Sequence, residues 1–313
     1  LVNKVLRKEI EIAEELQLHK KQVEETIKLL DEGNTVPFIA RYRKEVTGSL
    51  SDEVLRSLQE RLVYLRALEE RRLEITRLLD EQGVLDEELQ QKIARAKVLV
   101  ELEDIYRPFK PKRKTRASVA KEKGLEPLAQ FLLNETKGDP LTEAINYINA
   151  ELGVNSVEEA LQGAQDIIAE MVSDDAEARG AIRDMVRKKG ILISRKKAKS
   201  EERSPYEMYY EYQESVKSIP PHRVLAINRG EKEEFLEVKI DFPSIEIFSF
   251  LQKYFITKEL CGLTYVQAAI LDGYNRLLTP SLEREIRKEL TEKGEAQAIK
   301  VFSQNLKKLL LSP

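Results

Sequence analysis

Apolar residues recur at helical spacing along most of this chain, and few helix-breaking residues interrupt them. Val23, Ile27 and Leu30 fall at i, i+4 and i+7, the spacing of one buried helix face. A longer apolar stripe follows Ser51, a residue type that caps helix N-termini, and can run to Gln82. Only 13 glycines and 11 prolines occur in 313 residues. The pattern therefore predicts a mainly α fold, a multi-helical scaffold.

The breaks between these stripes predict five regions along the chain. Pro108 and Pro111 forbid a regular helix where lysines and arginines crowd together. Two apolar runs, 224–228 and 234–240, lie either side of the polar segment RGEKE and predict a small β-hairpin insertion. The expected regions are a helical region over 1–105, a basic loop over 106–124, a second helical region over 125–200, an irregular segment with the hairpin over 201–242, and C-terminal helices over 243–313.

The segment after the first apolar stripe has the outline of a helix-turn-helix. Gly33 ends one helix, and Thr35 followed by Pro37 begins another. The second, short helix carries Arg41, Tyr42, Arg43 and Lys44 side by side. Such a helix can offer cations to a nucleic acid, but many all-α proteins turn this way through packing alone. Both interpretations stay open at the level of the residues.

Charge is strongly segregated, although the net charge is only −3. Residues 107–124 carry a local charge of +7, and residues 187–199 carry another +7, which leaves −17 for the rest of the chain. Segregated cations create local fields that a net value hides. Either segment can contact a polyanion, or be a solvated or protein-facing surface. The candidate nucleic-acid-binding residues are Arg41, Arg43, Lys44, Lys110, Lys112, Arg113, Lys114, Arg116, Arg195, Lys196 and Lys197.

Motifs that carry catalysis are missing from the sequence. His19 and His222 belong to no zinc motif, and the chain holds no GxxxxGK, GxGxxG or GxSxG pattern. The single Cys261 excludes an internal disulfide and a cysteine-based zinc site, and no run of about 18 apolar residues could span a membrane. We expect a cytoplasmic protein that is not an enzyme, with no catalytic residue, metal or cofactor.

Three stretches resemble the N-terminal region of the bacterial Tex family of transcription accessory proteins. They occur in the family's order and are TVPFIARYRKEVTGSLSDEVLRSLQERLVYL (35–65), ELEDIYRPFKPKRKTRASVAKEKGLEPLA (101–129) and PPHRVLAINRGEKEEFLEVKI (220–240). The resemblance implies a helical part excised before the family's RNase H-like (YqgF-type), helix-hairpin-helix and S1 domains. It also implies a role in transcription and nucleic-acid binding, including RNA binding, with the S1 domain as the expected main RNA contact. It carries over no catalytic residue.

Two functions from different classes follow. In the first, the chain binds RNA or DNA weakly and without sequence specificity through its basic segments. In the second, it is a helical scaffold that positions the nucleic-acid-binding domains on the transcription machinery. Convergence of the basic segments on one face would favour the first function, and scatter the second. We expect a monomer or weak self-association, with Leu309–Leu311 less buried than Val301 and Phe302.

Overall fold

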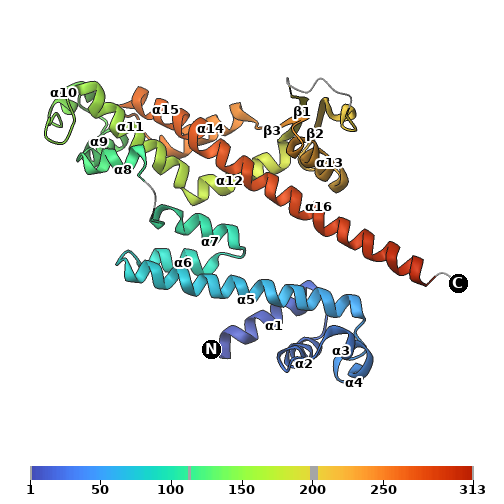
Figure 1. Cartoon of the computed structure of the whole chain (residues 1–313). Coiled ribbons are helices and arrows are strands. Elements are labelled where there is room, and N and C mark those ends of the chain that lie inside the picture. Colours follow the sequence, from blue (N-terminus) through green and yellow to red (C-terminus); the bar gives the residue numbers. More distant parts are fainter. Residues whose placement is uncertain (1, 112–113, 198–203, 312–313) are drawn as a thin grey trace. The chain divides into compact units, whose positions relative to one another are not determined.

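The computed structural model describes residues 2–111, 114–197 and 204–311, and over these residues the chain is mainly helical with one small sheet. The predicted fold class is confirmed. The chain divides into two compact units, residues 1–106 and residues 107–313 (Figure 1). Lys112 and Arg113, two of the candidate residues, lie outside the described residues.

Unit 1 is built on one long helix. Its helices are α1 (Val2–Glu15), α2 (Lys20–Asp31), α3 (Val36–Tyr42), α4 (Lys44–Thr47), α5 (Asp52–Glu81), α6 (Glu87–Arg95) and α7 (Leu99–Tyr106). Helix α5 spans about 45 Å at ~1.5 Å per residue, and Ser51 caps it by accepting a hydrogen bond from the Val54 amide. The predicted start and extent of this helix are confirmed.

The apolar face of α5 forms the core of unit 1. Leu55, Leu58 and Leu62 are buried where α1, α2 and α3 pack against the first half of the helix. Ile75 and Leu79 are buried farther along the same helix, which α6 and α7 also contact. The spacing of these residues puts them on one stripe, as the sequence predicts.

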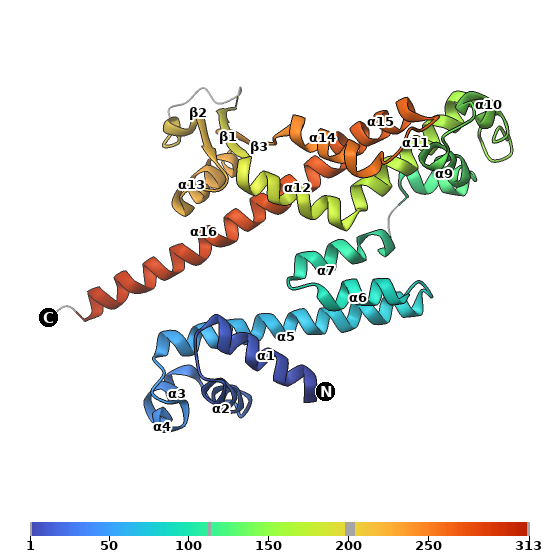
Figure 2. The ribbon, with the colours of Figure 1, turned by 180° about the vertical axis from the view of Figure 1, so that it is seen from behind.

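Unit 2 packs helices around α11, with a three-stranded sheet at one end (Figures 1 and 2). Its first elements are η1 (Arg107–Phe109), α8 (Arg116–Glu122), α9 (Glu126–Asn134), α10 (Pro140–Ile145), α11 (Val157–Asp174) and α12 (Ala176–Lys189). The later elements are β1 (Ile191–Lys196), η2 (Glu207–Tyr209), β2 (Glu211–Ser215), α13 (Pro221–Lys232), β3 (Leu236–Asp241), α14 (Ser244–Phe255), α15 (Leu263–Asp272), η3 (Gly273–Leu278, a π-helix) and α16 (Thr279–Leu310).

The sheet corrects the predicted hairpin. Its strand order is β2-β1-β3 with both pairings antiparallel, and residues 224–228 lie in helix α13 rather than in a strand. A short apolar run does not distinguish a strand from a buried helix segment by periodicity. Here Pro221 occupies the first turn of a helix, where proline is favoured. Val224 and Ile227 then share one buried face, because residues three apart lie together on a helix.

The basic loop prediction also needs correction over its last part. Residues 116–122 form helix α8. Thr115 caps this helix, since its hydroxyl accepts a hydrogen bond from the Ser118 amide at 3.0 Å. Ala117 and Ala120 are buried on the face of α8 that meets α11. The two prolines prevent a helix only upstream, at Pro108 and Pro111.

A ladder of ion pairs fixes α12 beside α16. Arg179 and Arg183 are almost fully buried and both bond the carboxylate of Glu285. Arg187 donates two hydrogen bonds to the Glu289 carboxylate, and the shorter of them is 2.6 Å. The arginines repeat every four residues on α12, and so do the glutamates on α16, so the two rows meet along the helices. Breaking such a buried pair would leave an uncompensated charge.

Helix α16 is buried along its first half only. Leu282, Ile286 and Leu290 lie in the core, and after Gly294 no described residue of the helix is buried. Val301 is 42% exposed and Phe302 67% exposed, whereas Leu309, Leu310 and Leu311 are 74%, 73% and 71% exposed. The expected order of burial is confirmed. The second half of α16 projects beyond the other elements of unit 2 (Figure 2).

Candidate nucleic-acid interface

The cations at the junction of α3 and α4 are exposed. Arg41, Arg43 and Lys44 all face solvent, and among the described residues none of the three has an ion-pair partner. Glu45 is the one carboxylate in this stretch of sequence. Three cations within four residues form a compact positive surface, because Glu45 offsets only one of their charges and pairs with none of them among the described residues.

Aromatic rings lie among these cations. Phe38 and Tyr42 are 37% and 58% exposed, and their ring centroids lie 5.3 Å apart. The Arg43 guanidinium lies 5.6 Å from the centroid of Phe38, and that of Arg41 lies 6.0 Å from the centroid of Tyr42. The sequence interpretation singled out the cations and missed Phe38. The spacing of Phe38 and Tyr42, four residues apart on a helix whose opposite face is buried, could have revealed it.

The backbone under this aromatic and basic cluster is held in place. Val36 and Ile39 are buried against Leu29 and Leu55. After α4 the chain turns through Gly48, whose φ of +65° suits glycine. The Gln22 side chain donates a hydrogen bond to the Thr47 carbonyl at 3.1 Å, which ties the end of α4 to α2. The cluster therefore sits on a platform fixed by packing, with a helix, a turn and a short basic helix in the predicted order.

Most of the described cations in residues 107–123 are engaged inside unit 2. Arg107 donates to Asp174 at 3.1 Å and to the Ser281 hydroxyl at 3.3 Å. Lys123 donates to the Gly153 carbonyl at 2.6 Å. Lys110 is half-buried and makes contacts of its own, and Lys114 lies 3.5 Å from the Glu122 carboxylate. The charge that the sequence shows as +7 is partly neutralised by these contacts.

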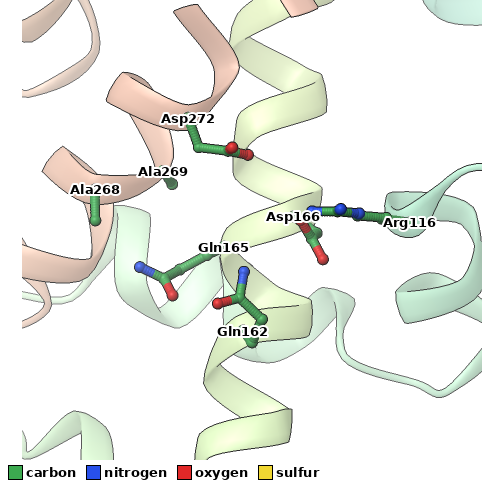
Figure 3. A pocket seen from close by; sticks show the side chains of 7 residues that line it. All are labelled: Arg116, Gln162, Gln165, Asp166, Ala268, Ala269 and Asp272. Atoms are coloured by element: carbon green, nitrogen blue, oxygen red, sulfur yellow. The ribbon is translucent and has the colours of Figure 1, made fainter. Parts of the chain in front are cut away.

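Arg116, from the same segment, lines a pocket of about 550 Å³. Figure 3 shows its guanidinium beside Asp166, with Gln162 and Gln165 on one side and Asp272 on the other. Gln165 donates to the Tyr265 carbonyl at 3.1 Å. Arg276 bonds both carboxylates, with contacts of 3.0 Å to Asp272 and 3.3 Å to Asp166. The opposite charges around the pocket therefore largely balance.

Burial raises the pKa of Asp166 above its ordinary value. The guanidinium groups of Arg276 and Arg116 act against this rise, and the Asp272 carboxylate adds to it. The pocket supplies two carboxylates, but no nucleophile with an adjacent base. Over the residues that the structure describes, no group of three or more His, Cys, Asp or Glu side chains could hold a metal ion.

The basic segment over residues 187–197 also contains both paired and unpaired cations. Lys189 pairs with Glu246 at 2.5 Å, and Lys197 with Glu234 at 3.0 Å. Arg195 and Lys196 are exposed on β1, and the Lys196 ammonium lies 5.1 Å from the centroid of the Tyr210 ring. The tyrosines of this region mainly pack: Tyr206 and Tyr209 are buried.

The structure does not bring the two basic segments of unit 2 together. Helix α8 lies at one end of that unit and β1 lies at the other, in both views (Figures 1 and 2). The Arg41–Lys44 cluster belongs to unit 1. Because scattered basic segments favour the scaffold function, the arrangement within unit 2 favours the scaffold. The exposed cations of the unit 1 cluster, in contrast, remain available to a polyanion.

Comparison with known proteins gives two family matches. Residues 8–80 match the "Tex-like protein N-terminal domain", and residues 135–302 match the "Tex central region-like" family. Protein YdcI of Bacillus subtilis is 48% identical over 307 residues, and the match covers 97% of this chain and 43% of YdcI. The "Transcriptional accessory protein Tex" of Neisseria gonorrhoeae is 36% identical, over 96% of this chain and 40% of that protein. The human "S1 RNA-binding domain-containing protein 1" is 30% identical, and the match covers 91% of this chain and 30% of that protein. The chain thus spans about two fifths of the length of its bacterial relatives.

Proposed function

This chain belongs to the Tex family, and on that premise we propose that it is a helical part of a transcription accessory protein that contacts single-stranded nucleic acid. The contact is weak and independent of sequence, and the cluster at the junction of α3 and α4 makes it. The relatives' names, one a "Transcriptional accessory protein" and one an "S1 RNA-binding domain-containing protein", support this class of function.

The observation that carries the proposal is that cations without an ion-pair partner lie beside exposed aromatic rings. Arg41, Arg43 and Lys44 can each neutralise a phosphate, since none is held by a carboxylate. Phe38 and Tyr42 expose their rings beside them, and unstacked bases bind to such rings in a sequence-tolerant way. Arginine over an aromatic ring adds a further favourable stack.

A second candidate function is the helical scaffold, and two observations in unit 2 favour it. The basic segments there lie at opposite ends, and many of their cations are used in ion pairs or backbone contacts. The ladder of ion pairs between α12 and α16, buried at Arg179 and Arg183, fixes a long helix in one register. A rigid body of this kind is suited to hold other parts of the protein, or a partner, at a fixed separation.

A salt-dependent titration tests the first function. A labelled single-stranded oligonucleotide is titrated with the chain at several salt concentrations. Neutralisation of about three phosphates predicts that log K falls against log salt with a slope of about −2. The triple variant Arg41→Ala, Arg43→Ala, Lys44→Ala should lose most of the affinity and flatten the slope toward zero.

A matched variant removes the same charge elsewhere in unit 1. Arg56, Arg77 and Lys92 are exposed cations, each paired with a carboxylate four residues away. Their replacement by alanine should leave the slope within about 0.5 of the parent, because these cations are already neutralised locally. Equal losses in both triple variants would indicate a net-charge effect and would remove the cluster from the proposal.

We also propose that the chain has no turnover of its own. The sequence lacks phosphate loops and nucleophile motifs, and the pocket beside Arg116 lacks an activated nucleophile. Incubation of the purified chain with RNA, DNA or ATP and divalent metal ions should leave each of them intact. Reproducible cleavage that co-purifies with the chain and is lost in Asp166→Asn would contradict this proposal.

A further inference from the structure

Helix α10 and the turn after it expose an apolar surface at one end of unit 2. Leu141 and Ile145, one helical turn apart on α10, are 51% and 57% exposed. Ile148 follows at 43% exposure, in a turn that continues the helix through the hydrogen bond from its amide to the Ile145 carbonyl. Leu141 and Ile145 share one face of α10, because residues four apart lie together on a helix. With Ile148, which an i→i+3 hydrogen bond holds just beyond the end of α10, they form an apolar strip.

The opposite face of the same segment already supplies the core contacts. Pro140 and Ala144 are buried, and α10 packs on α9 and α11. The turn that follows is closed by two hydrogen bonds of 2.9 Å between Asn149 and Val154, and Val154 is buried. The other face of α10 holds the segment in place, so the three exposed side chains of the strip contribute nothing to the core.

The surroundings of this strip are acidic. Residues 135–159 contain one cation, Lys137. They contain six carboxylates, none of which has an ion-pair partner among the described residues: Glu135, Asp139, Glu143, Glu151, Glu158 and Glu159. Elsewhere in unit 2 many carboxylates are paired with arginine or lysine, as in the α12–α16 ladder. The segment has a net charge of −5, which becomes −4 when Lys123, whose ammonium bonds the Gly153 carbonyl, is counted with it. Such a surface repels phosphate and attracts cations.

We propose that this acidic and apolar tip is a docking surface for a basic amphipathic segment of a partner protein. The partner's apolar residues, at helical spacing, would cover Leu141, Ile145 and Ile148, and its lysines or arginines would meet the unpaired carboxylates. The surface is independent of the Arg41–Lys44 cluster, which lies in unit 1 and has the opposite charge.

A tryptophan-labelled peptide tests the proposal on the intact chain. The chain contains no tryptophan, so the emission of a peptide with one tryptophan reports binding without background. The probe is a peptide of lysines and leucines with the leucines at helical spacing. One control peptide has glutamate in place of lysine, and another has the same composition with the leucines out of register. Only the basic amphipathic peptide should bind saturably.

Variants locate the bound peptide. Ile145→Ser and Glu151→Lys should each raise the Kd by about fivefold or more, the scale of about 1 kcal/mol lost from an interface. Ile245→Ser makes the same change at a residue 86% exposed on α14, and Glu237→Lys reverses an exposed charge on β3. Both controls should leave the Kd within about twofold.

Several results would overturn the proposal. These are no saturable binding, equal binding of the acidic or out-of-register peptide, and a Kd that Ile145→Ser leaves unchanged. Nucleic-acid binding that falls in Ile145→Ser would make the tip a nucleic-acid site instead. Self-association in sedimentation that Ile145→Ser abolishes would make it a contact between two copies of this chain.

Discussion

Asp166 and Asp139 are two carboxyl groups of unit 2 whose surroundings act in opposite directions. Burial raises the pKa of Asp166, and this effect is larger than the lowering by the charges of Arg276 and Arg116. Hydrogen bonds from the Thr142 hydroxyl and amide lower the pKa of Asp139, which caps α10. A raised pKa means that ionisation of Asp166 opposes folding once the pH rises above the ordinary range of an aspartate. A lowered pKa means that ionised Asp139 favours folding, and this contribution is lost as the pH falls through its folded value.

The two asparagine variants should therefore respond to pH with opposite signs. Asp166→Asn should gain stability relative to the parent between about pH 4 and pH 7, because it removes a charge that the fold disfavours. Asp139→Asn should be less stable than the parent across this whole interval, and its deficit should shrink only when the pH falls below the ordinary pKa of an aspartate. Urea midpoints at the two pH values measure both effects. A stability difference for Asp166→Asn that stays constant with pH would show that its carboxyl titrates as in the unfolded chain.

At the scale of single residues, the sequence predicts caps well and contacts poorly. Ser51, Asp86 and Thr115 all accept hydrogen bonds at helix starts, and the cap at Ser51 was expected because capping depends on neighbours in sequence. The engagement of Arg107 by Asp174 and Ser281 could not be expected. Its partners lie 67 and 174 residues away, and local charge counting treats such a cation as free.

At the scale of elements, two glycines in helical segments of unit 2 have opposite roles. Gly273 begins the π-helical segment η3, and a Cβ there would lie 2.7 Å from the Ala169 carbonyl oxygen on α11. Gly180 is interior to α12, and a Cβ there would meet nothing within 4 Å. The first glycine permits a close approach of backbones, and the second only weakens its helix.

Alanine substitution should separate these roles. Gly273→Ala should destabilise unit 2 by about 1–3 kcal/mol, since the atoms that it meets are backbone and cannot move aside. Gly180→Ala should stabilise it by about 0.5–1 kcal/mol through helix propensity. Denaturant unfolding followed by circular dichroism measures both values. Equal effects of the two variants would mean that α11 and η3 are not in close contact.

The sequence predicted helices more securely than strands. The long stripe of α5 repeats over many turns, so its period is unambiguous. The run over 224–228 is too short to show a period, and its helical form depends on burial of Val224 and Ile227 in the packed unit. Strand β1 is the centre of the sheet because β2 and β3, both distant in sequence, pair with it.

At the scale of the whole chain, two compact units belong to a Tex-family sequence that spans about two fifths of its bacterial relatives. In the part that the structure describes, no helix combines the length and apolarity that a membrane crossing needs. The segregation of charge is visible in the sequence, but the fold decides which cations remain available. The 107–123 and 187–197 segments use many of theirs internally, whereas the Arg41–Lys44 cluster keeps its cations exposed.

The central claim is that single-stranded nucleic acid binds on the cluster of Phe38, Arg41, Tyr42, Arg43 and Lys44. The most direct measurement is photocrosslinking of an oligonucleotide that carries a photoreactive base, followed by mass spectrometry of the crosslinked peptides. Stacking on the exposed rings predicts crosslinks at Phe38 or Tyr42, and a loss of the Tyr42 crosslinks in Tyr42→Leu. Crosslinks confined to unit 2, with none between residues 36 and 47, would contradict the account.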